Sequence, residues 1–434
     1  MVGRKIFYLG TALSTVAVLA APGPVFAAGY ELLEQSAVTQ GNAYAGAGAR
    51  ADDSSTMYFN PAGITKLPGI EVSSGVSGIF PQGRLISGTA AAPGGFPTYA
   101  GVAGTNSGST AALPNFTATA QLTDSLFVGL GLTSPFGLAT KYPSDSVVRY
   151  YALTTQLKTI NIAPTIAWQA LPQVSLGGGL NIETAQAHLS NAIDFGGLGF
   201  VHGIPGLFPG SADGSATIRG SDTALGWNAG ALYEPVAGTR IGLTYRSAVF
   251  HDLSGTVNYY SVPTLLAAGF HNGPATAKLP EPSRAALSVA QDIGDWTLLG
   301  SLTYTGWSIF HSLTAFSGTT AISSTAENFH DTVAVAVGAD YRVNDKLTLR
   351  TGTMFDPTPV RDNFRNPRLA DNDRYWLSIG ATYRPIPNLA LSAAYSHIFA
   401  SNASVNGATS SAGSLSAMYS LSIDIASVQV AYRF

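Results

Sequence analysis

The sequence contains no cysteine and few charged side chains. Of its 434 residues, 11% are Asp, Glu, Lys or Arg, against roughly 25% in typical soluble domains. The absence of cysteine excludes disulfide scaffolds, thiol catalysis and thiolate metal sites. A net charge of −3 without a basic tract gives no reason to expect a nucleic-acid partner. Low charge with a mean hydropathy of only +0.19 fits a chain that faces lipid on one side and water on the other.

Long apolar runs are also missing, except at the N-terminus. Residues 1–27 are typical of a signal peptide, with Arg4 and Lys5 preceding the apolar run Ile6–Ala21 and cleavage expected after Ala27. An uncleaved membrane anchor is the alternative. No other stretch approaches the ~18 apolar residues that a membrane-spanning helix needs. In a secreted chain of this kind, a closed β-barrel is the structure that satisfies backbone hydrogen bonds in lipid.

Alternating side chains predict strands with one lipid-facing and one water-facing side. Trp296–Phe310, Phe329–Val343 and Arg374–Arg384 all place apolar or aromatic residues at every second position and polar residues between them. Tyr375 and Tyr383 would stand about 20 Å apart in height on a tilted strand, close to the spacing of two aromatic girdles. A soluble sandwich also alternates, but it does not usually collect arginines on one face behind a signal peptide.

Short and long connectors alternate along residues 69–434. Six short and seven long connectors predict fourteen strands. Short periplasmic turns opposite long extracellular loops are typical of outer-membrane barrels. We therefore predict an all-β fold, a 14-stranded antiparallel transmembrane barrel in the outer membrane of a Gram-negative bacterium. An even strand number places both ends of the barrel at the periplasmic side.

Residues 28–68 lack the alternation and are rich in small side chains. We predict that this segment is a hatch, a plug folded inside the barrel. Its motifs AGYELLEQS, GNAYAG and NPAG resemble the start of mature FadL-type outer-membrane transporters, the channels for long-chain fatty acids and aromatic hydrocarbons. Later stretches such as GLTSPFGLAT, GWNAGALYEP and DNDRYWLSIGATYR extend the resemblance over most of the barrel. The terminal Phe434 resembles the signal that the barrel-assembly machinery reads.

The resemblance implies a gate at Asn60, Pro61 and Ala62 of the hatch. Asn60 can bond its own backbone and start a turn, Pro61 stiffens that turn, and Ala62 allows close approach to the wall. The motif either anchors the plug or couples plug movement to cargo. Asp52 and Asp53 precede it and are expected to pair with lumen-facing arginines.

The resemblance also implies that basic side chains of the wall hold a fatty-acid carboxylate. The matching positions are near His188 and at His330, and a neutral histidine binds a carboxylate less strongly than Lys or Arg. Alternation predicts that His330 faces the lumen and that His188 faces lipid or a rim. Either Arg246, Arg350 or Arg374 holds the headgroup instead, or the cargo is a neutral hydrocarbon.

Two predicted extracellular loops are unusually apolar. Exposed apolar clusters mark binding or membrane-contact surfaces, and the resemblance implies an entrance groove for hydrophobic cargo. Packing of the loops on each other as a lid is the alternative. The residues are Phe195, Leu198, Phe200, Ile204, Leu207 and Phe208 in one loop, and Leu265, Leu266 and Phe270 in the next.

The third predicted strand contains or adjoins Gly131, Pro135 and Gly137. Proline removes a ladder donor and glycine marks kinks or bulges. This strand is our candidate for a gap in the wall through which cargo leaves sideways into the membrane. Alternatively, Pro135 ends the strand at the rim.

No residue pattern predicts catalysis, a metal site or another cofactor, so we do not expect an enzyme. Asp371-Asn372-Asp373 resembles a calcium loop only superficially and is better explained as a polar turn. The function predicted is passive uptake of hydrophobic small molecules, most of all long-chain fatty acids, by a monomer surrounded by lipid and lipopolysaccharide. The alternatives are a neutral-hydrocarbon transporter, a general porin, and a structural or adhesin barrel.

Overall fold

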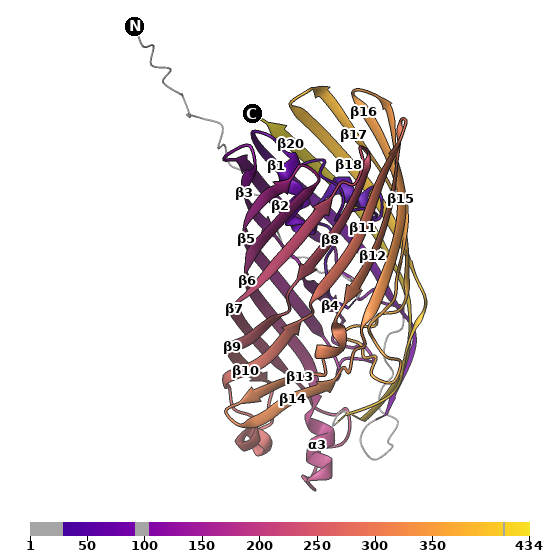
Figure 1. Ribbon diagram of the computed structural model, residues 1–434. Coiled ribbons are helices and arrows are strands. Elements are labelled where there is room, and N and C mark those ends of the chain that lie inside the picture. The colour runs from indigo at the N-terminus through magenta and orange to yellow at the C-terminus, as the bar shows by residue number, and fades with distance from the viewer. Residues whose placement is uncertain (1–28, 92–103, 411–412) are drawn as a thin grey trace.

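The strands form one closed antiparallel barrel (Figure 1). The computed structural model describes residues 29–91, 104–410 and 413–434, so the predicted signal peptide, residues 1–27, lies outside the described residues. The barrel closes where the first strand, β1 (Ile70–Ala91), pairs with the last, β20 (Gly413–Arg433). No helix in the described ranges has the length and apolar character needed to cross a membrane.

Fourteen strands make the wall, as predicted. Six of them are interrupted and consist of two successive segments: β3 with β4, β8 with β9, β10 with β11, β12 with β13, β14 with β15, and β18 with β19. The remaining bounds are β2 (Ala111–Gln121), β3 (Leu126–Thr133), β4 (Gly137–Lys141), β5 (Thr154–Leu171), β6 (Val174–Asp194), β7 (Asp213–Tyr233), β8 (Thr239–Arg246), β9 (Val249–Tyr260), β10 (Gly273–Glu281), β11 (Arg284–Ile293), β12 (Trp296–Thr305), β13 (Ser312–Ser317), β14 (Thr320–Ala326), β15 (Thr332–Asn344), β16 (Leu347–Asp356), β17 (Arg374–Ile386), β18 (Leu389–Ala400) and β19 (Ala403–Ser410).

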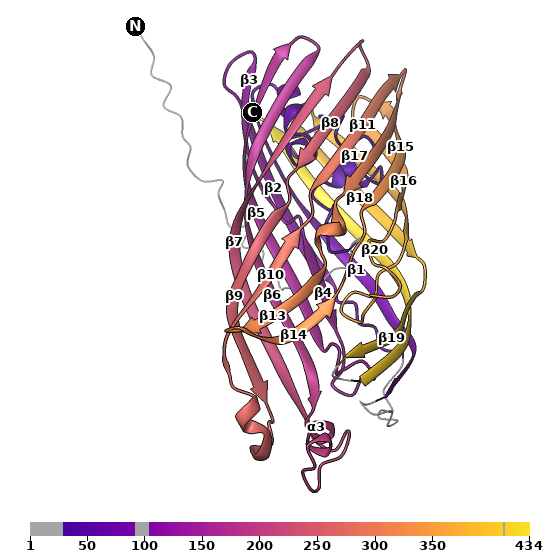
Figure 2. The ribbon, with the colours of Figure 1, turned by 60° about the horizontal axis from the view of Figure 1, so that its bottom comes forward.

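Side-chain alternation in the wall follows the sequence prediction. On β17, Tyr375 and Tyr383 are 53% and 48% exposed, whereas Arg374, Ser378 and Thr382, which occupy the alternate positions, are buried. Lipid-facing aromatic and aliphatic side chains therefore cover the outside, and polar side chains face the lumen. The strands end in tight turns on one side and in longer connections on the other, where the helix α3 (Phe195–Val201) protrudes (Figure 2).

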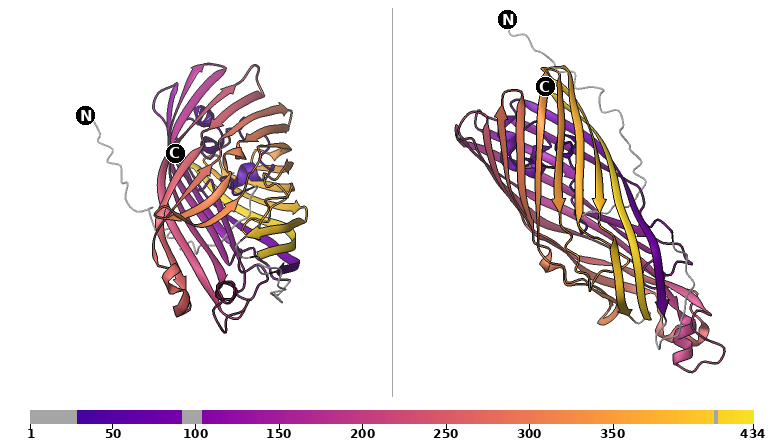
Figure 3. Two further views of the ribbon diagram at one scale, coloured as in Figure 1. Left: turned by 90° about the horizontal axis from the view of Figure 1, so that it is seen from below. Right: turned by 90° about the vertical axis from the view of Figure 1, so that its right-hand side faces the viewer.

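The segment that precedes β1, Gly29–Leu67, packs against the inward side of the wall. It contains α1 (Ala37–Gln40), α2 (Thr56–Phe59) and the 3₁₀-helix η1 (Pro61–Lys66), and nearly all its residues are buried. Figure 3 shows its short helices within the ring of strands. This segment lies within residues 28–68, for which the sequence predicts a hatch; that role stays a prediction.

Glycines of the wall let this segment approach the strands closely. A Cβ added at Gly352 would lie 2.1 Å from the backbone oxygen of Asn42, and one at Gly242 would lie 1.9 Å from that of Gly48. Such distances are far below van der Waals contact, so any other residue would displace the segment or the strand. The wall and the N-terminal segment are thus fitted to each other backbone to backbone.

Gly352→Val and Gly242→Val are therefore expected to loosen the N-terminal segment from the wall. Overpacking costs roughly 1–3 kcal/mol, which favours the released segment over the seated one. We expect ion conductance in planar bilayers to appear and protease cleavage within Gly29–Leu67 to increase. Gly300→Val is the matched control, since its Cβ meets no neighbour nearer than 4.0 Å. Equal conductance in all three variants would contradict the expectation.

Candidate functional site

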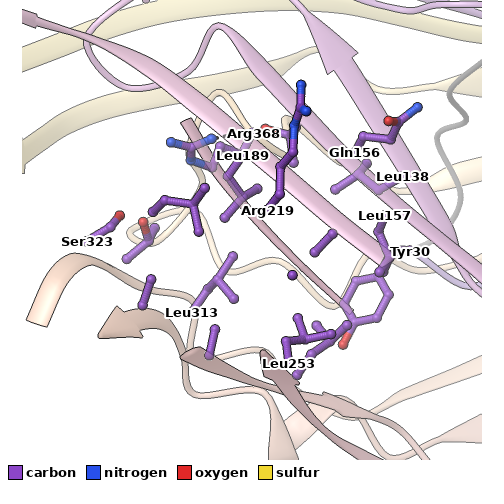
Figure 4. Close-up of a pocket in the computed structure, with 18 of the residues that line it drawn as sticks. Tyr30, Leu138, Gln156, Leu157, Leu189, Arg219, Leu253, Leu313, Ser323 and Arg368 are labelled. Carbon is purple, nitrogen blue, oxygen red and sulfur yellow. Dashed lines mark hydrogen bonds between the residues drawn. The ribbon is translucent and has the colours of Figure 1, made fainter. Parts of the chain in front are cut away.

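An apolar cavity lies in the barrel beside the N-terminal segment, with about 960 Å³ of empty space that includes space open to solvent (Figure 4). Residues of several strands from β4 to β14 line it, together with the connection before β17. Its aliphatic lining includes Leu138, Leu157, Leu189, Leu253, Leu279 and Leu313.

The N-terminal segment contributes Tyr30 to this cavity. The Tyr30 hydroxyl donates to the Pro280 carbonyl at 2.6 Å, and its ring packs edge-on to Trp307 with centroids 4.8 Å apart. Phe136 and Phe310 stand at 5.7 and 5.5 Å from the same ring. The cavity is therefore bounded on one side by an aromatic cluster that joins the N-terminal segment to the wall.

Arg368 is a buried cation in the cavity lining, at 8% exposure. Its guanidinium makes only long hydrogen bonds, including 3.3 Å to the Thr155 hydroxyl and 3.4 Å to the Asn191 side-chain oxygen. Within the described part of the chain no carboxylate lies at ion-pair distance from it. Figure 4 places Arg368 and Tyr30 on opposite sides of the cavity. The sequence prediction missed Arg368, because it lies in a connection between strands.

Glu327 lines the same cavity but does not cancel this positive charge at neutral pH. Burial raises the pKa of its carboxyl to about 8, although the hydrogen bond from Asn366 and the charge of Arg368 lower it. Burial lowers the pKa of Arg368 to about 10, so its guanidinium is still cationic at pH 7. The cavity thus combines a long aliphatic lining with the cationic Arg368, and Arg219 contributes to the lining as well.

The two histidines proposed from the resemblance do not line this cavity. His330 precedes β15 and its Nδ1 contacts the backbone oxygen of Asp331 at 2.9 Å. Strand alternation therefore does not decide which way its side chain points, and the lumen-facing position of His330 stays a prediction. His188 lies on β6 between Ala187 and Leu189, both of which line the cavity. Its position between them on the strand agrees with the alternation, and its lipid-facing or rim position stays a prediction.

Three inward arginines were the other headgroup candidates, and each is engaged elsewhere. Arg246 donates to Asn181 Oδ1 at 2.8 Å and to the Tyr58 carbonyl at 3.2 Å. Arg350 donates to the Thr382 hydroxyl at 2.6 Å. Arg374 pairs with Asp371, which is buried in the connection before β17.

The acidic residues of the N-terminal segment have partners other than those expected. Asp52 pairs with Arg50 at 2.5 Å, and Arg50 also pairs with wall residue Asp340 at 2.6 Å. Asp53 accepts a hydrogen bond from Gln429 at 2.8 Å. One arginine of the segment itself thus bridges Asp52 to the wall, in place of the predicted pairing with Arg246, Arg350 or Arg374.

Asn60, Pro61 and Ala62 begin the 3₁₀-helix η1 against the wall. The Asn60 side-chain oxygen accepts from the Ala62 backbone N–H at 3.0 Å and caps η1. Its amide donates to the Gly48 carbonyl at 2.6 Å and to the Ala231 carbonyl of β7 at 3.1 Å. Asn60 therefore both fixes a turn of the N-terminal segment and attaches the segment to β7.

The two apolar loops contain the helix α3 and the 3₁₀-helix η2 (Thr264–Gly269). Phe195 is buried and packs edge-on to Phe270 at 4.9 Å, so the two loops touch. Phe208 and Leu265 remain 60% and 75% exposed. The other predicted groove residues, Leu198, Phe200, Ile204, Leu207 and Leu266, lie in the same two connections.

The third wall strand is interrupted by one extra residue at Pro135. On the β5 side, the ladder pairs Thr133 with Asn161 and resumes at Gly137 with Lys158, so three residues oppose two. This is the geometry of a bulge. Gly131 lies within the regular ladder before the break, opposite Ala163.

The bulge turns the strand toward the N-terminal segment. The Leu32 N–H donates to the Pro135 carbonyl at 2.7 Å, and the Gly137 N–H donates to the Tyr30 carbonyl at 2.8 Å. On the other side, the ladder with β2 ends at Phe116 opposite Leu132. Within the described residues, no ladder pair joins the rest of β2 to β4. Further along, β4 is joined to the residues that precede β2, by the bridge between Thr140 and Gly108 and by the Lys141 N–H, which donates to the Ser107 carbonyl at 3.0 Å.

The comparisons with known proteins agree with this architecture. The family described as "Outer membrane protein transport protein (OMPP1/FadL/TodX)" matches residues 18–434. The chain is 34% identical over 410 residues to a long-chain fatty acid transport protein of Escherichia coli O157:H7, covering 88% of this chain and 89% of that protein. It is 29% identical over 467 residues to a putative outer membrane protein of Neisseria meningitidis, covering 99% and 98%.

Solved structures show the same fold. A Pseudomonas aeruginosa FadL homologue superposes with a TM-score of 0.87 at 24% identity, over 94% of this chain and all of that one. The Ralstonia pickettii toluene transporter TbuX gives a TM-score of 0.66 at 18% identity, over 92% and 98%. By the family match and its curated relatives, the chain belongs to the OMPP1/FadL/TodX family of outer-membrane transport proteins.

Proposed function

We propose that this protein carries long-chain fatty acids across the outer membrane by way of the apolar cavity, with the carboxylate held at Arg368. The observation that carries the proposal is a buried guanidinium, without a carboxylate at ion-pair distance in the described chain, at one side of an aliphatic cavity. An amphipathic chain with one anionic end complements this arrangement.

Each part of the cavity matches one part of such a cargo. Transfer of an alkyl chain from water into the leucine-lined space is favourable by roughly 0.8 kcal/mol per CH₂ group. A charge-assisted hydrogen bond between Arg368 and a carboxylate adds roughly 1.5–3 kcal/mol. The apolar part supplies most of the affinity, and Arg368 selects acids over neutral hydrocarbons.

We further propose a route through the molecule. The exposed side chains around Phe208 and Leu265 collect cargo outside, and the cavity receives it. Cargo then leaves sideways, between β2 and the bulge at Pro135, into the membrane. The N-terminal segment acts as the hatch, with Asn60, Pro61 and Ala62 as its anchor, and keeps the bore closed to ions.

Binding of oleate and toluene to purified protein tests the choice of cargo. We expect oleate to bind in the micromolar range or more tightly and toluene to bind more weakly, since it gains nothing from Arg368. Isothermal titration in detergent at pH 7 measures both. Equal or tighter binding of toluene would instead favour transport of a neutral hydrocarbon.

The pH dependence of oleate binding reports on Glu327. Its carboxyl has a pKa of about 8, so it is neutral below that pH and becomes negative as pH rises through it. The new charge offsets Arg368 and repels the oleate carboxylate. We expect affinity to be highest below pH 8 and to fall by up to about ten-fold per pH unit above it.

Glu327→Gln is expected to remove that fall, because glutamine stays neutral and still accepts the hydrogen bond from Asn366. Titrations of both proteins with oleate between pH 6.5 and 9.5 make the comparison. Identical pH profiles would contradict the role assigned to Glu327.

A further inference from the structure

Three inward side chains from different strands meet in the layer next to the cavity. Glu183 of β6, His251 of β9 and Glu281 of β10 bring their ligand atoms within 4.8 Å of one another. Each is at most 1% exposed. His251 and Glu281 stand two residues from Leu253 and Leu279 of the cavity lining, hence on the same face of their strands.

The carboxylate of Asp222 fixes the tautomer of His251. Its Nδ1 lies 3.3 Å from Asp222 Oδ2, and an ionised carboxylate only accepts hydrogen bonds. Nδ1 therefore carries the proton, and in the neutral ring Nε2 presents a lone pair. Metal-binding histidines are commonly oriented in this way, with the other ring nitrogen donating to a carboxylate.

The atoms that converge on the cluster are acceptors without donors. Within the described chain, His251 Nε2, both carboxylate oxygens of Glu281 and Glu183 Oε1 have no hydrogen-bond partner. The distance from Nε2 to Glu281 Oε1 is 3.8 Å, too long for a hydrogen bond. Buried acceptors that face one another are costly unless a proton or a cation lies between them.

The nearest arginines serve other groups. Arg246 donates to Asn181 and to the Tyr58 carbonyl, and Arg284 Nη1 lies 3.3 Å from Glu31. In residues 29–91, 104–410 and 413–434, neither comes within ion-pair distance of the cluster carboxylates. The charge of the cluster is thus left for a ligand to neutralise.

We propose that Glu183, His251 and Glu281 bind one divalent transition-metal ion, with zinc as the best fit. One imidazole nitrogen with carboxylate oxygens suits zinc and its neighbours, whereas calcium and magnesium prefer oxygen ligands alone. The ion would tie β6, β9 and β10 together beside Pro280, whose carbonyl accepts from Tyr30. It would therefore stiffen the wall where the N-terminal segment docks. No sequence pattern indicated the site, because its ligands lie on three separate strands.

Zinc titration of tag-free, EDTA-treated protein tests the proposal without any transport assay. The absence of cysteine removes thiolates as competing ligands. We expect one zinc per chain with a dissociation constant below about 10 µM and a rise in the thermal midpoint. Glu281→Gln and His251→Gln should weaken binding by at least about ten-fold and abolish the rise. His397→Gln is the matched control. His397 lies outside the cluster, where its Nδ1 is 2.7 Å from Asp424 Oδ1, so its loss should leave zinc binding unchanged.

X-ray absorption on the wild-type protein loaded with one zinc keeps the proposal testable if a variant fails to fold. The expected first shell holds one imidazole and oxygen ligands. The proposal is overturned if zinc does not bind, if Glu281→Gln and His251→Gln bind it like the wild type, or if the shell holds two or more imidazoles. Absence of binding would mean that protons neutralise the cluster.

Discussion

Replacing Arg368 with methionine is expected to weaken oleate binding by roughly 10- to 100-fold, the equivalent of one charge-assisted hydrogen bond of about 1.5–3 kcal/mol. Methionine keeps the cavity filled and apolar, so the change removes the charge with little loss of packing. Binding of oleyl alcohol, which has the same chain without a carboxylate, should change little. Titration of both ligands at pH 7 measures the difference.

Arg361→Met is the control for this variant. Arg361 lies in the same connection but is exposed and does not line the cavity. It should bind oleate like the wild type. If Arg368→Met weakens oleate and oleyl alcohol equally, Arg368 supports the shape of the cavity and does not hold a carboxylate.

Deleting Pro135 is expected to reduce oleate uptake by cells at least ten-fold while leaving oleate binding in detergent intact. Three residues between Thr133 and Gly137 oppose two residues of β5. Removing one of them gives β3 and β4 a single register on β5 and removes the bulge. The straightened strand can then pair with the rest of β2, and the proposed side exit closes.

Pro135→Ala separates the effect of the extra residue from that of proline. It supplies a backbone donor but keeps three residues against two, so the bulge and uptake should persist. Heat-modifiable migration on gels verifies that both variants fold as barrels. Uptake at the wild-type level by a correctly folded deletion variant would exclude exit at this bulge.

The barrel could be predicted because a strand between lipid and water has a two-residue period. On β17, that period alone separated outward Tyr375 and Tyr383 from inward Ser378 and Thr382. The division of wall strands into segments was less predictable. The break between β8 and β9 falls at Ser247 and Ala248. Neither residue is a proline or a glycine, so the sequence does not mark the break.

The cavity was harder to predict than the wall. Alternation states which side chains point inward, but it does not state which inward side chains lie at the same height as a cavity. Arg246, Arg350 and Arg374 were therefore reasonable headgroup candidates, although the structure gives each of them other partners. Arg368 lies in a connection, where no periodicity exists and only three-dimensional packing brings it to the cavity.

The contacts of the N-terminal segment show the same limit. The small residues of Gly29–Leu67 indicated close packing, and the NPAG motif marked the turn at Asn60. The partners of that packing are glycines such as Gly242 and Gly352, scattered over distant strands. Their role depends on the register of the closed barrel, which a single sequence does not specify.

An experimental structure of the protein with oleate tests the central claim most directly. We predict the alkyl chain among Leu157, Leu189, Leu253 and Leu279, with the carboxylate at hydrogen-bond distance from Arg368. Oleate bound only on the outer surface, or in the cavity with its carboxylate directed away from Arg368, would contradict the proposed mode of recognition.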